Sequence, residues 1–231
     1  MAVYDISGNE IATGGGGGSP INGKRIMLIS DSNVQYNATT FVNYMADNYG
    51  CTLICNATAG ATWETSSGTE TTQTTSGVGK TNVIIRDGVG TGSTRLETNV
   101  DYYVYMLGTN MGTLGTPSDP SSDVSTMCGA MRYCLQKMCW FGRNKVIGGI
   151  LPFRTEDSGT AEPTKNQYMR QIYQEFAVPI LDLWNYGRVI NNNLIPDSDG
   201  AYAYTDGGNH INAYGVQQVL NVVGQWLAYE L

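Results

Sequence analysis

Short apolar stretches alternate with amphipathic stretches along most of this chain, from Gly23 to the last residue. The apolar stretches contain few polar residues, which is typical of strands buried on both faces of a sheet. The predicted strands are Lys24–Ser30, Cys51–Asn56, Val100–Leu107, Lys145–Leu151 and Val178–Leu181. The predicted helices, with apolar residues at helical spacing, are Thr39–Tyr49, Val124–Trp140, Asn166–Phe176 and Ala213–Tyr229. Because strands alternate with helices, the pattern predicts an α/β fold of three layers, α/β/α, around a central parallel sheet.

The N-terminal part has a different composition from the rest. Gly14–Ser19 is a glycine run, which predicts a flexible linker because glycine loses much conformational entropy on ordering and has no side chain to pack. The segment before the run has a hairpin-like turn at Ser7–Asn9 between two short apolar pieces. We therefore expect an N-terminal adapter and linker over residues 1–22 and a single domain over residues 23–231.

A stretch rich in Thr, Ser and Gly, Thr62–Ser93, predicts a long surface excursion with one apolar island at Val83–Ile85. Within it, Thr74–Thr81 looks like a phosphate-binding loop. That motif needs glycine where this chain has Thr74, and a helix after it, whereas β-favouring residues follow here. No Gly-x-Ser-x-Gly is present either. We therefore expect no nucleotide cofactor and no nucleophile elbow of the α/β-hydrolase kind.

Charge and composition exclude several classes of partner. Charged residues make up 14% of the chain, below the usual share of about 25%. The 13 Lys and Arg against 20 Asp and Glu give a net charge of −7, with no basic cluster for a row of phosphates. Nor is there an apolar run of about 18 residues for a membrane span. We expect neither nucleic acid nor membrane as a partner.

Cysteine, histidine and the first residues complete this picture. The 5 cysteines are odd in number and show no Cys-x-x-Cys, so we expect reduced core residues. With 1 histidine, His210, a His-rich zinc site is excluded, and no metal is predicted. The first ten residues lack a basic region followed by an apolar one, so no secretory signal is expected. That absence favours a cytoplasmic or virion-associated protein.

Polar residues follow the predicted strands where each one ends. Ser32 comes directly after the first strand, and in an open parallel sheet ligands bind outside the carboxyl ends of strands. A serine there lies at a helix N-terminus, where free N–H groups favour developing negative charge. The alternative is that Ser32 only caps the helix. Similarly, His210 before the last helix is either a structural histidine or a catalytic base.

Taken in order, these strand-end residues resemble the SGNH (GDSL-type) hydrolase family from Gly23 to Leu231. The family's Gly-Asp-Ser block corresponds to Ser30–Ser32, with serine in place of glycine, and its second-block glycine to Gly60. Its Gly-x-Asn-Asp block corresponds to Gly108–Met111, with Met111 in place of Asp. Its last block, Asp-x-x-His, corresponds to Asp206 through His210, with one extra residue between them.

The resemblance implies a flavodoxin-like three-layer fold and a role for each matched residue. Ser32 is the expected nucleophile, His210 the base that removes its proton, and Asp206 the acid that orients the base. The expected oxyanion donors are the backbone N–H groups of Ser32 and Gly60 and the side-chain amide of Asn110. Asp206 reaches the imidazole if Gly207 and Gly208 let the loop bulge. If it points to solvent instead, Ser32 and His210 act as a dyad.

The resemblance also implies a serine esterase, here one that removes O-acetyl or another short acyl group from a carbohydrate. Residues at strand ends are expected to bind the substrate, although aromatic loop residues also cover core edges; they are Asp31, Trp63, Thr109, Phe153 and Arg154. The altered first and last blocks favour an alternative, an inactive glycan-binding or structural module. The N-terminal segment looks like those that join such domains to larger assemblies, including phage tail or fibre proteins.

Overall fold

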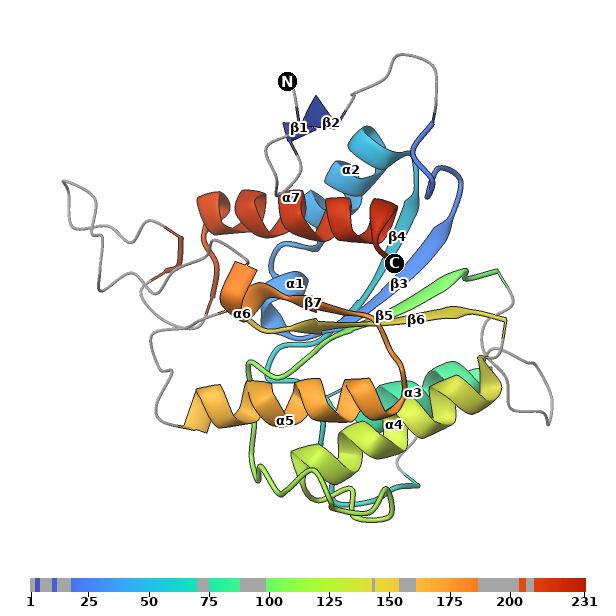
Figure 1. Ribbon diagram of the computed structural model, residues 1–231, viewed down its shortest axis with the longest axis vertical. Helices are drawn as coiled ribbons and strands as arrows, with labels where there is room; N and C mark the ends of the chain where they lie inside the picture. The colour runs from blue at the N-terminus through green and yellow to red at the C-terminus, as the bar shows by residue number, and fades with distance from the viewer. Residues whose placement is uncertain are drawn as a thin grey trace.

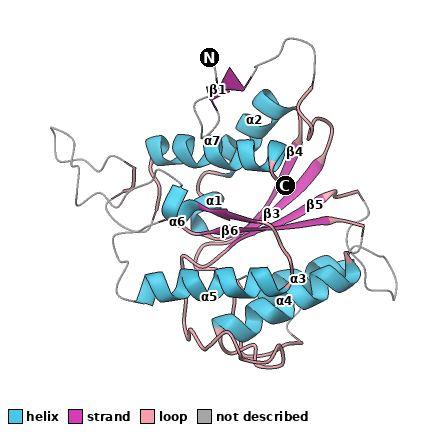
Figure 2. Ribbon diagram, in the orientation of Figure 1, coloured by secondary structure: helices cyan, strands magenta, loops and turns pink. Residues whose placement is uncertain are grey.

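The computed structural model describes residues 3–4, 10–11, 18–69, 75–87, 99–142, 144–153, 161–186, 204–206 and 210–231. Five parallel strands form one sheet in the order β4-β3-β5-β6-β7, which runs through the middle of the molecule (Figures 1 and 2). The strands are β3 (Arg25–Ser30), β4 (Thr52–Ala57), β5 (Tyr102–Met106), β6 (Val146–Leu151) and β7 (Ile180–Asp182). The expected parallel sheet is therefore confirmed.

Helices cover both faces of this sheet, as Figure 1 shows. On one face lie α2 (Ala38–Tyr49) and α7 (Ala213–Tyr229), and on the other lie α3 (Gly77–Asp87), α4 (Met127–Phe141) and α5 (Ala161–Glu175). Two single-turn helices, α1 (Ser32–Gln35) and α6 (Leu183–Tyr186), directly follow β3 and β7. The arrangement is the predicted three-layer α/β/α architecture.

The interior strand β3, which lies between β4 and β5, shows why the sequence pattern predicts two covered faces. Met27 and Ile29 pack in the core on the side of α4 and α5, whereas Ile26 and Leu28 pack in the core beneath α2 and α7. Alternate side chains of a strand point to opposite faces, so a strand buried on both must be apolar throughout. Burying each such side chain stabilises the fold by about 1.5–3 kcal/mol.

The expected surface excursion over Thr62–Ser93 is wrong in its middle part. Residues 77–87 form α3, which packs on α4 and buries Val78, Ile84 and Ile85. The three residues that suggested a β-favouring island lie instead on a helix, because burial against α4 outweighs the weak intrinsic preference of β-branched residues. A helix thus begins within the Thr74–Thr81 stretch, at Gly77, and the case against a phosphate-binding loop rests on the missing first glycine.

Helix ends differ from the predicted ones by a few residues. The helix expected at Val124 begins at Met127, because Thr126 caps it by accepting a hydrogen bond from the Gly129 N–H at 3.1 Å. The helix expected at Asn166 begins at Ala161. Pro163 lies in its first turn, where a missing N–H costs nothing. The helical stripes were thus placed correctly, and the caps set their ends.

The N-terminal segment forms a small sheet of its own. β1 (Val3–Tyr4) and β2 (Glu10–Ile11) pair antiparallel, as a hairpin requires, while the turn at Ser7–Asn9 and most of the glycine run lie outside the described residues. The packed domain begins before the expected residue 23, because Ile21 is 1% exposed and belongs to the core beneath α2 and α7.

The cysteines are free, and each is buried or half-buried, as predicted. Burial raises the pKa of the Cys55 thiol to about 11 and that of the Cys134 thiol to about 12, so both stay protonated at neutral pH. Across the part of the chain that the structure describes, no helix is long and apolar enough to cross a membrane.

Candidate active site

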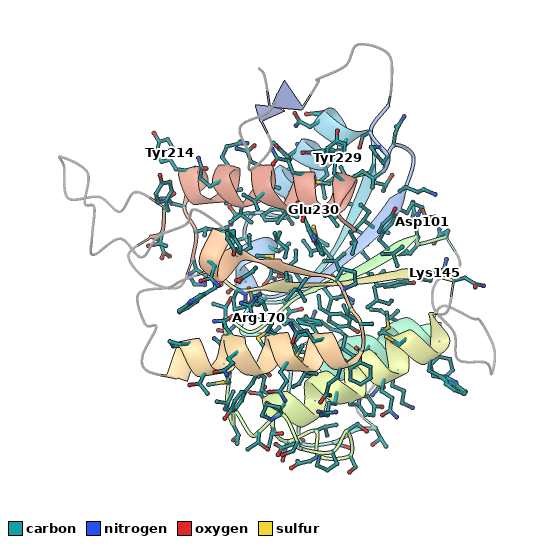
Figure 3. All side chains as sticks on the ribbon, in the orientation of Figure 1. Asp101, Lys145, Arg170, Tyr214, Tyr229 and Glu230 are labelled. Carbon is teal, nitrogen blue, oxygen red and sulfur yellow. The ribbon has the colours of Figure 1, made fainter. Side chains whose placement is uncertain are left out.

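The carboxyl ends of three adjacent strands bring the predicted site residues to one edge of the sheet. Ser30, at the end of β3, pairs in register with Ala57 at the end of β4 and with Met106 at the end of β5. The turns that follow these strands therefore start side by side. In Figure 3, Tyr214, just beyond the His210 loop, lies on one side of the molecule. Asp101 and Lys145, which precede β5 and β6, lie on the opposite side.

Ser32 is the first residue of α1, and Asp31 is the residue that caps this helix. The Asp31 carboxylate accepts a hydrogen bond from the Asn33 N–H at 3.0 Å, which leaves the Ser32 hydroxyl uncommitted to capping. The interpretation of Ser32 as a mere cap is therefore wrong. Asp31, expected among the substrate-binding residues, is 2% exposed, and this burial raises the pKa of its carboxyl. The Asp31 carboxyl therefore lies buried beneath the site, where it caps α1.

His210 lies between Ser32 and Asp206. Its Nε2 is 3.1 Å from the Ser32 hydroxyl oxygen, and its Nδ1 is 3.2 Å from a carboxylate oxygen of Asp206. Both distances are within hydrogen-bonding range for a serine, base and acid arrangement. Ser32 is 4% exposed, whereas the side chains of His210 and Asp206 are 37% and 52% exposed. The three residues therefore form a continuous chain of contacts that opens toward solvent.

A short antiparallel contact joins the residues on either side of the loop between Asp206 and His210. Thr205 and Ile211 form an isolated β-bridge, and the Asp206 N–H donates to the His210 carbonyl at 2.9 Å. The two side chains thus leave the same end of this bridge, which brings the carboxylate to Nδ1. The bulge expected at Gly207 and Gly208 lies outside the described residues.

Asn33, which the sequence analysis did not single out, ties three parts of the site together. Its side-chain oxygen accepts from the Ile211 N–H at 3.1 Å, next to His210, and its side-chain nitrogen lies 3.5 Å from the Thr109 hydroxyl. The residue is fully buried. A polar residue directly after Ser32, at the end of an apolar strand, was the available signal.

The expected oxyanion donors all lie in the turns at this edge. Gly60 has φ +72°, in the left-handed region where a side chain is strained, and the space that a Cβ would fill is open. Glycine is thus required by the backbone conformation and not by a close neighbour. The Asn110 side-chain amide donates to the Ala61 carbonyl at 3.2 Å. Since a primary amide has two N–H donors, this bond fixes the amide and leaves the second donor for a ligand.

Ser30 stands where the Gly-Asp-Ser block of the SGNH family has glycine, and the structure shows how a serine fits there. Its side chain is fully buried, and the hydroxyl donates to the Met106 carbonyl at 2.8 Å. A buried hydroxyl with a partner costs little, whereas an unpaired one is destabilising by about 1–3 kcal/mol. The substitution therefore adds a bond between β3 and β5 next to Ser32.

The prediction that Trp63 and Phe153 bind the substrate is wrong. Trp63 is fully buried and stacks on Tyr105 with ring centroids 5.0 Å apart, and Phe153 is 1% exposed in the core beneath α7. Both aromatic rings therefore belong to the core, and neither has a face left for a ligand. Thr109 is half-buried at the site beside Asn33, and Arg154 lies outside the described residues.

Tyr36 is an aromatic residue of the site that the sequence analysis missed. Its ring is 63% exposed and meets the His210 ring edge to face, with centroids 5.1 Å apart. It follows α1 directly, four residues after Ser32, so its spacing from Ser32 was the signal available in the sequence. No three His, Cys, Asp or Glu side chains gather into a metal site within the described ranges.

Comparison with known proteins gives matches to solved structures, while no family model and no curated protein sequence matches this chain. An acetyl xylan esterase matches with a TM-score of 0.54 and 14% identity, over 89% of this chain and 99% of that one. A carbohydrate acetylesterase family member from Sinorhizobium meliloti matches at 0.52 and 15%, over 90% and 100%. A protein named as a GDSL-like lipase from Bacteroides ovatus matches at 0.50 and 16%, over 89% and 98%.

These similarities extend over nearly the whole length of each chain at low sequence identity. They show that the overall fold is shared while the sequences have diverged. The fold of this chain is that of the SGNH (GDSL-type) hydrolases.

Proposed function

We propose that this protein is a serine ester hydrolase. The observation that carries the proposal is the pair of contacts at His210, 3.1 Å from Nε2 to the Ser32 hydroxyl oxygen and 3.2 Å from Nδ1 to the Asp206 carboxylate. A hydroxyl beside an imidazole that is itself held by a carboxylate is the arrangement that activates serine as a nucleophile. The similarity in fold to proteins named as esterases supports the same reaction class.

In the proposed reaction, the Ser32 oxygen attacks the ester carbonyl carbon while His210 Nε2 takes the hydroxyl proton. The carbonyl oxygen becomes an oxyanion, which the N–H groups of Ser32 and Gly60 and the Asn110 amide would stabilise. The intermediate then breaks its bond to the alcohol, which leaves with the proton from Nε2. Water attacks the resulting acyl-serine, His210 again takes a proton, and the carboxylic acid leaves as the Ser32 hydroxyl re-forms.

The substrate class that we propose is a short acyl ester, an O-acetyl group above all, on a carbohydrate. Two of the similar structures are named as an acetyl xylan esterase and a carbohydrate acetylesterase family member. In this chain, the exposed ring of Tyr36 beside His210 supports the same class, because an aromatic face can pack against the apolar face of a sugar. A surface with few charges is also compatible with a neutral glycan.

The altered first and last blocks had favoured a module without activity. The Ser30 hydroxyl donates a hydrogen bond to the Met106 carbonyl, so serine fits at this position. The bridge between Thr205 and Ile211 keeps Asp206 within reach of His210 despite the longer spacing. We therefore favour the enzyme. We also propose that the segment before Ile21 joins the domain to a larger assembly, since β1 and β2 pair with each other and not with the five-stranded sheet.

Hydrolysis of p-nitrophenyl acetate by the purified protein tests the proposal. We expect turnover that falls to background in Ser32→Ala and His210→Ala, while Ser67→Ala, at an exposed loop position, keeps the full rate. A serine-directed fluorophosphonate should label Ser32. Release of acetate from acetylated xylan, compared with its release from small aryl esters, then tests the carbohydrate. Equal rates in the wild type and Ser32→Ala would refute the esterase.

A further inference from the structure

A buried lysine lies beneath the turn that carries Gly60. Lys80 belongs to the first turn of α3 and is 2% exposed, which is rare for a lysine because an ammonium group loses its hydration on burial. Lys80 lies outside the sequence blocks in which this chain resembles the SGNH family, and the proposed reaction does not use it. Its side chain reaches from α3 to the carboxyl end of β4.

The contacts of Lys80 are with the residues that start the turn. Its Nζ donates to the Asn56 side-chain oxygen at 3.0 Å and to the Thr58 hydroxyl at 2.9 Å. Thr58 in turn donates its N–H to the Ser30 carbonyl at 3.2 Å and accepts the Ala61 N–H at 3.1 Å. Lys80 therefore holds the residue from which the backbone leaves β4 and turns back at Gly60.

The same turn is held from its other sides by residues of the site. The Ala59 N–H donates to the Gln35 side chain of α1, and the Asn110 amide donates to the Ala61 carbonyl. With Lys80 on Thr58, three successive anchors fix the backbone on both sides of Gly60. A donor fixed before the reaction costs no reorganisation when the oxyanion forms, and this is the main source of oxyanion stabilisation.

The charge of Lys80 also interacts with a charged residue of the site. Asp31, buried between β3 and α1, is the titratable group that acts on Lys80, while Asn56 and Thr58, which it contacts directly, do not titrate. His210 lies beyond Asp31 and acts on that carboxylate. Burial lowers the pKa of Lys80 to about 8, so the group is still largely an ammonium at neutral pH.

We propose that Lys80 is a positioning residue that fixes the Thr58–Gly60 turn as an oxyanion donor and, as a buried cation behind that turn, favours the negative charge of the intermediate. The inference rests on the proposed esterase function and assigns to that site a residue outside the Ser-His-Asp arrangement. Lys80 acts through Thr58 and Asn56, because it is 2% exposed and its ammonium group donates to these two side chains.

The test compares Lys80→Met with Lys24→Met in p-nitrophenyl acetate hydrolysis. Lys24 is a half-exposed lysine that pairs with Asp101 at the opposite edge of the sheet, at 3.7 Å, so it controls for the loss of one positive charge (Figure 3). We expect Lys80→Met to lower kcat at least about tenfold with KM within about twofold, because the donor acts in the transition state. Lys24→Met should keep both constants. A kcat in Lys80→Met equal to that of Lys24→Met would overturn the proposal.

The pH profile separates positioning from a general loss of folding. In the wild type, kcat should fall as pH rises through about 8, where Lys80 loses its charge, and this fall should be absent from Lys80→Met. A packing defect lowers the rate without removing a titration. The same alkaline fall in both proteins would overturn the role of the charge.

A second variant and a spectroscopic measurement cover the case in which Lys80→Met does not fold. Thr58→Val removes the hydroxyl that Lys80 holds and keeps the side-chain shape, so it should also lower kcat with little change in KM. In the folded full chain, the amide signal of Gly60 in a 15N–1H spectrum should shift in either variant and not in Lys24→Met. An unshifted Gly60 signal would overturn the positioning role. A shifted signal in a protein that hydrolyses no ester would instead leave that role standing and refute the esterase.

Discussion

Asp206→Asn tests how much the carboxylate contributes to the arrangement around His210. The carboxylate oxygen is 3.2 Å from Nδ1, yet the Asp206 side chain is 52% exposed. Two unit charges about 4 Å apart interact by about 4 kcal/mol near a protein surface and by about 1 kcal/mol in water. With half of the side chain in water, we expect Asp206 to stabilise the imidazolium of the transition state by about 1–3 kcal/mol. This energy corresponds to a loss of about fivefold to 150-fold in kcat.

This expected loss is smaller than the loss of about ten-thousandfold known for a buried triad aspartate. In a buried site, asparagine presents its N–H to Nδ1 and holds the imidazole in the wrong tautomer. At position 206, about half of the side chain lies in water, so an asparagine amide can turn and present its oxygen to Nδ1 instead. Exposure thus reduces both the charge effect and the tautomer effect.

The assay is the kcat of p-nitrophenyl acetate hydrolysis at neutral pH. Asp47→Asn serves as a matched control, since Asp47 is exposed on α2 and its replacement removes the same single negative charge. We expect Asp47→Asn to keep the wild-type rate. A loss under about threefold in Asp206→Asn would refute the reasoning and favour a dyad of Ser32 and His210, whereas a loss beyond about a thousandfold would show that the exposed carboxylate is not screened as argued.

Three further predictions concern other parts of the molecule. Asn110→Ala should lower kcat by about a hundredfold while changing KM little, because the second N–H of the amide would act on the oxyanion. Steady-state kinetics checks this, and a change in KM alone would contradict it. In urea unfolding, the free energy of unfolding of the wild type relative to that of Lys80→Met should increase as pH rises from 8 to 10.5. The reason is that the folded-state pKa of Lys80 is lowered from 10.5 to about 8, so the unfolded chain binds more protons in that window. A difference that does not change with pH would contradict this. Removal of residues 1–18 should leave kcat unchanged, because Ser19 and Ile21, which tie the chain to the core, remain; loss of folding would show that the segment belongs to the domain.

The sequence predicted the layers of the fold because burial leaves a periodic signal. The unbroken apolar run over 24–30 requires a strand with both faces covered, and β3 has them. The stripe that includes Met127, Met131 and Leu135 requires a helix with one buried face, and α4 follows. Ser32 and His210 were also singled out, since Ser32 follows an apolar strand and His210 is the one histidine.

The pattern failed where a segment takes its structure from its neighbours. α3 contains glycine, lysine, threonine and asparagine among its apolar residues, so its period is weak, and packing on α4 decides that it is a helix. Trp63 and Phe153 were expected at a groove because they follow strands. Whether a loop aromatic turns inward depends on space in the core, and sequence position does not report that space.

By itself, the sequence determined the five strands of the main sheet, four of the helices and the chemical groups that end each strand, because periodicity and residue type are local properties. The tertiary structure alone decided which groups meet. Ser32 and His210 are 178 positions apart, and they touch because the strand order places β3 in the sheet beside the turn that precedes α7. Lys80 lies in a stretch that reads as a loop, and only the packing of α3 beneath β4 carries its ammonium to Thr58. Contacts between distant residues depend on how elements stack, and no local pattern encodes that.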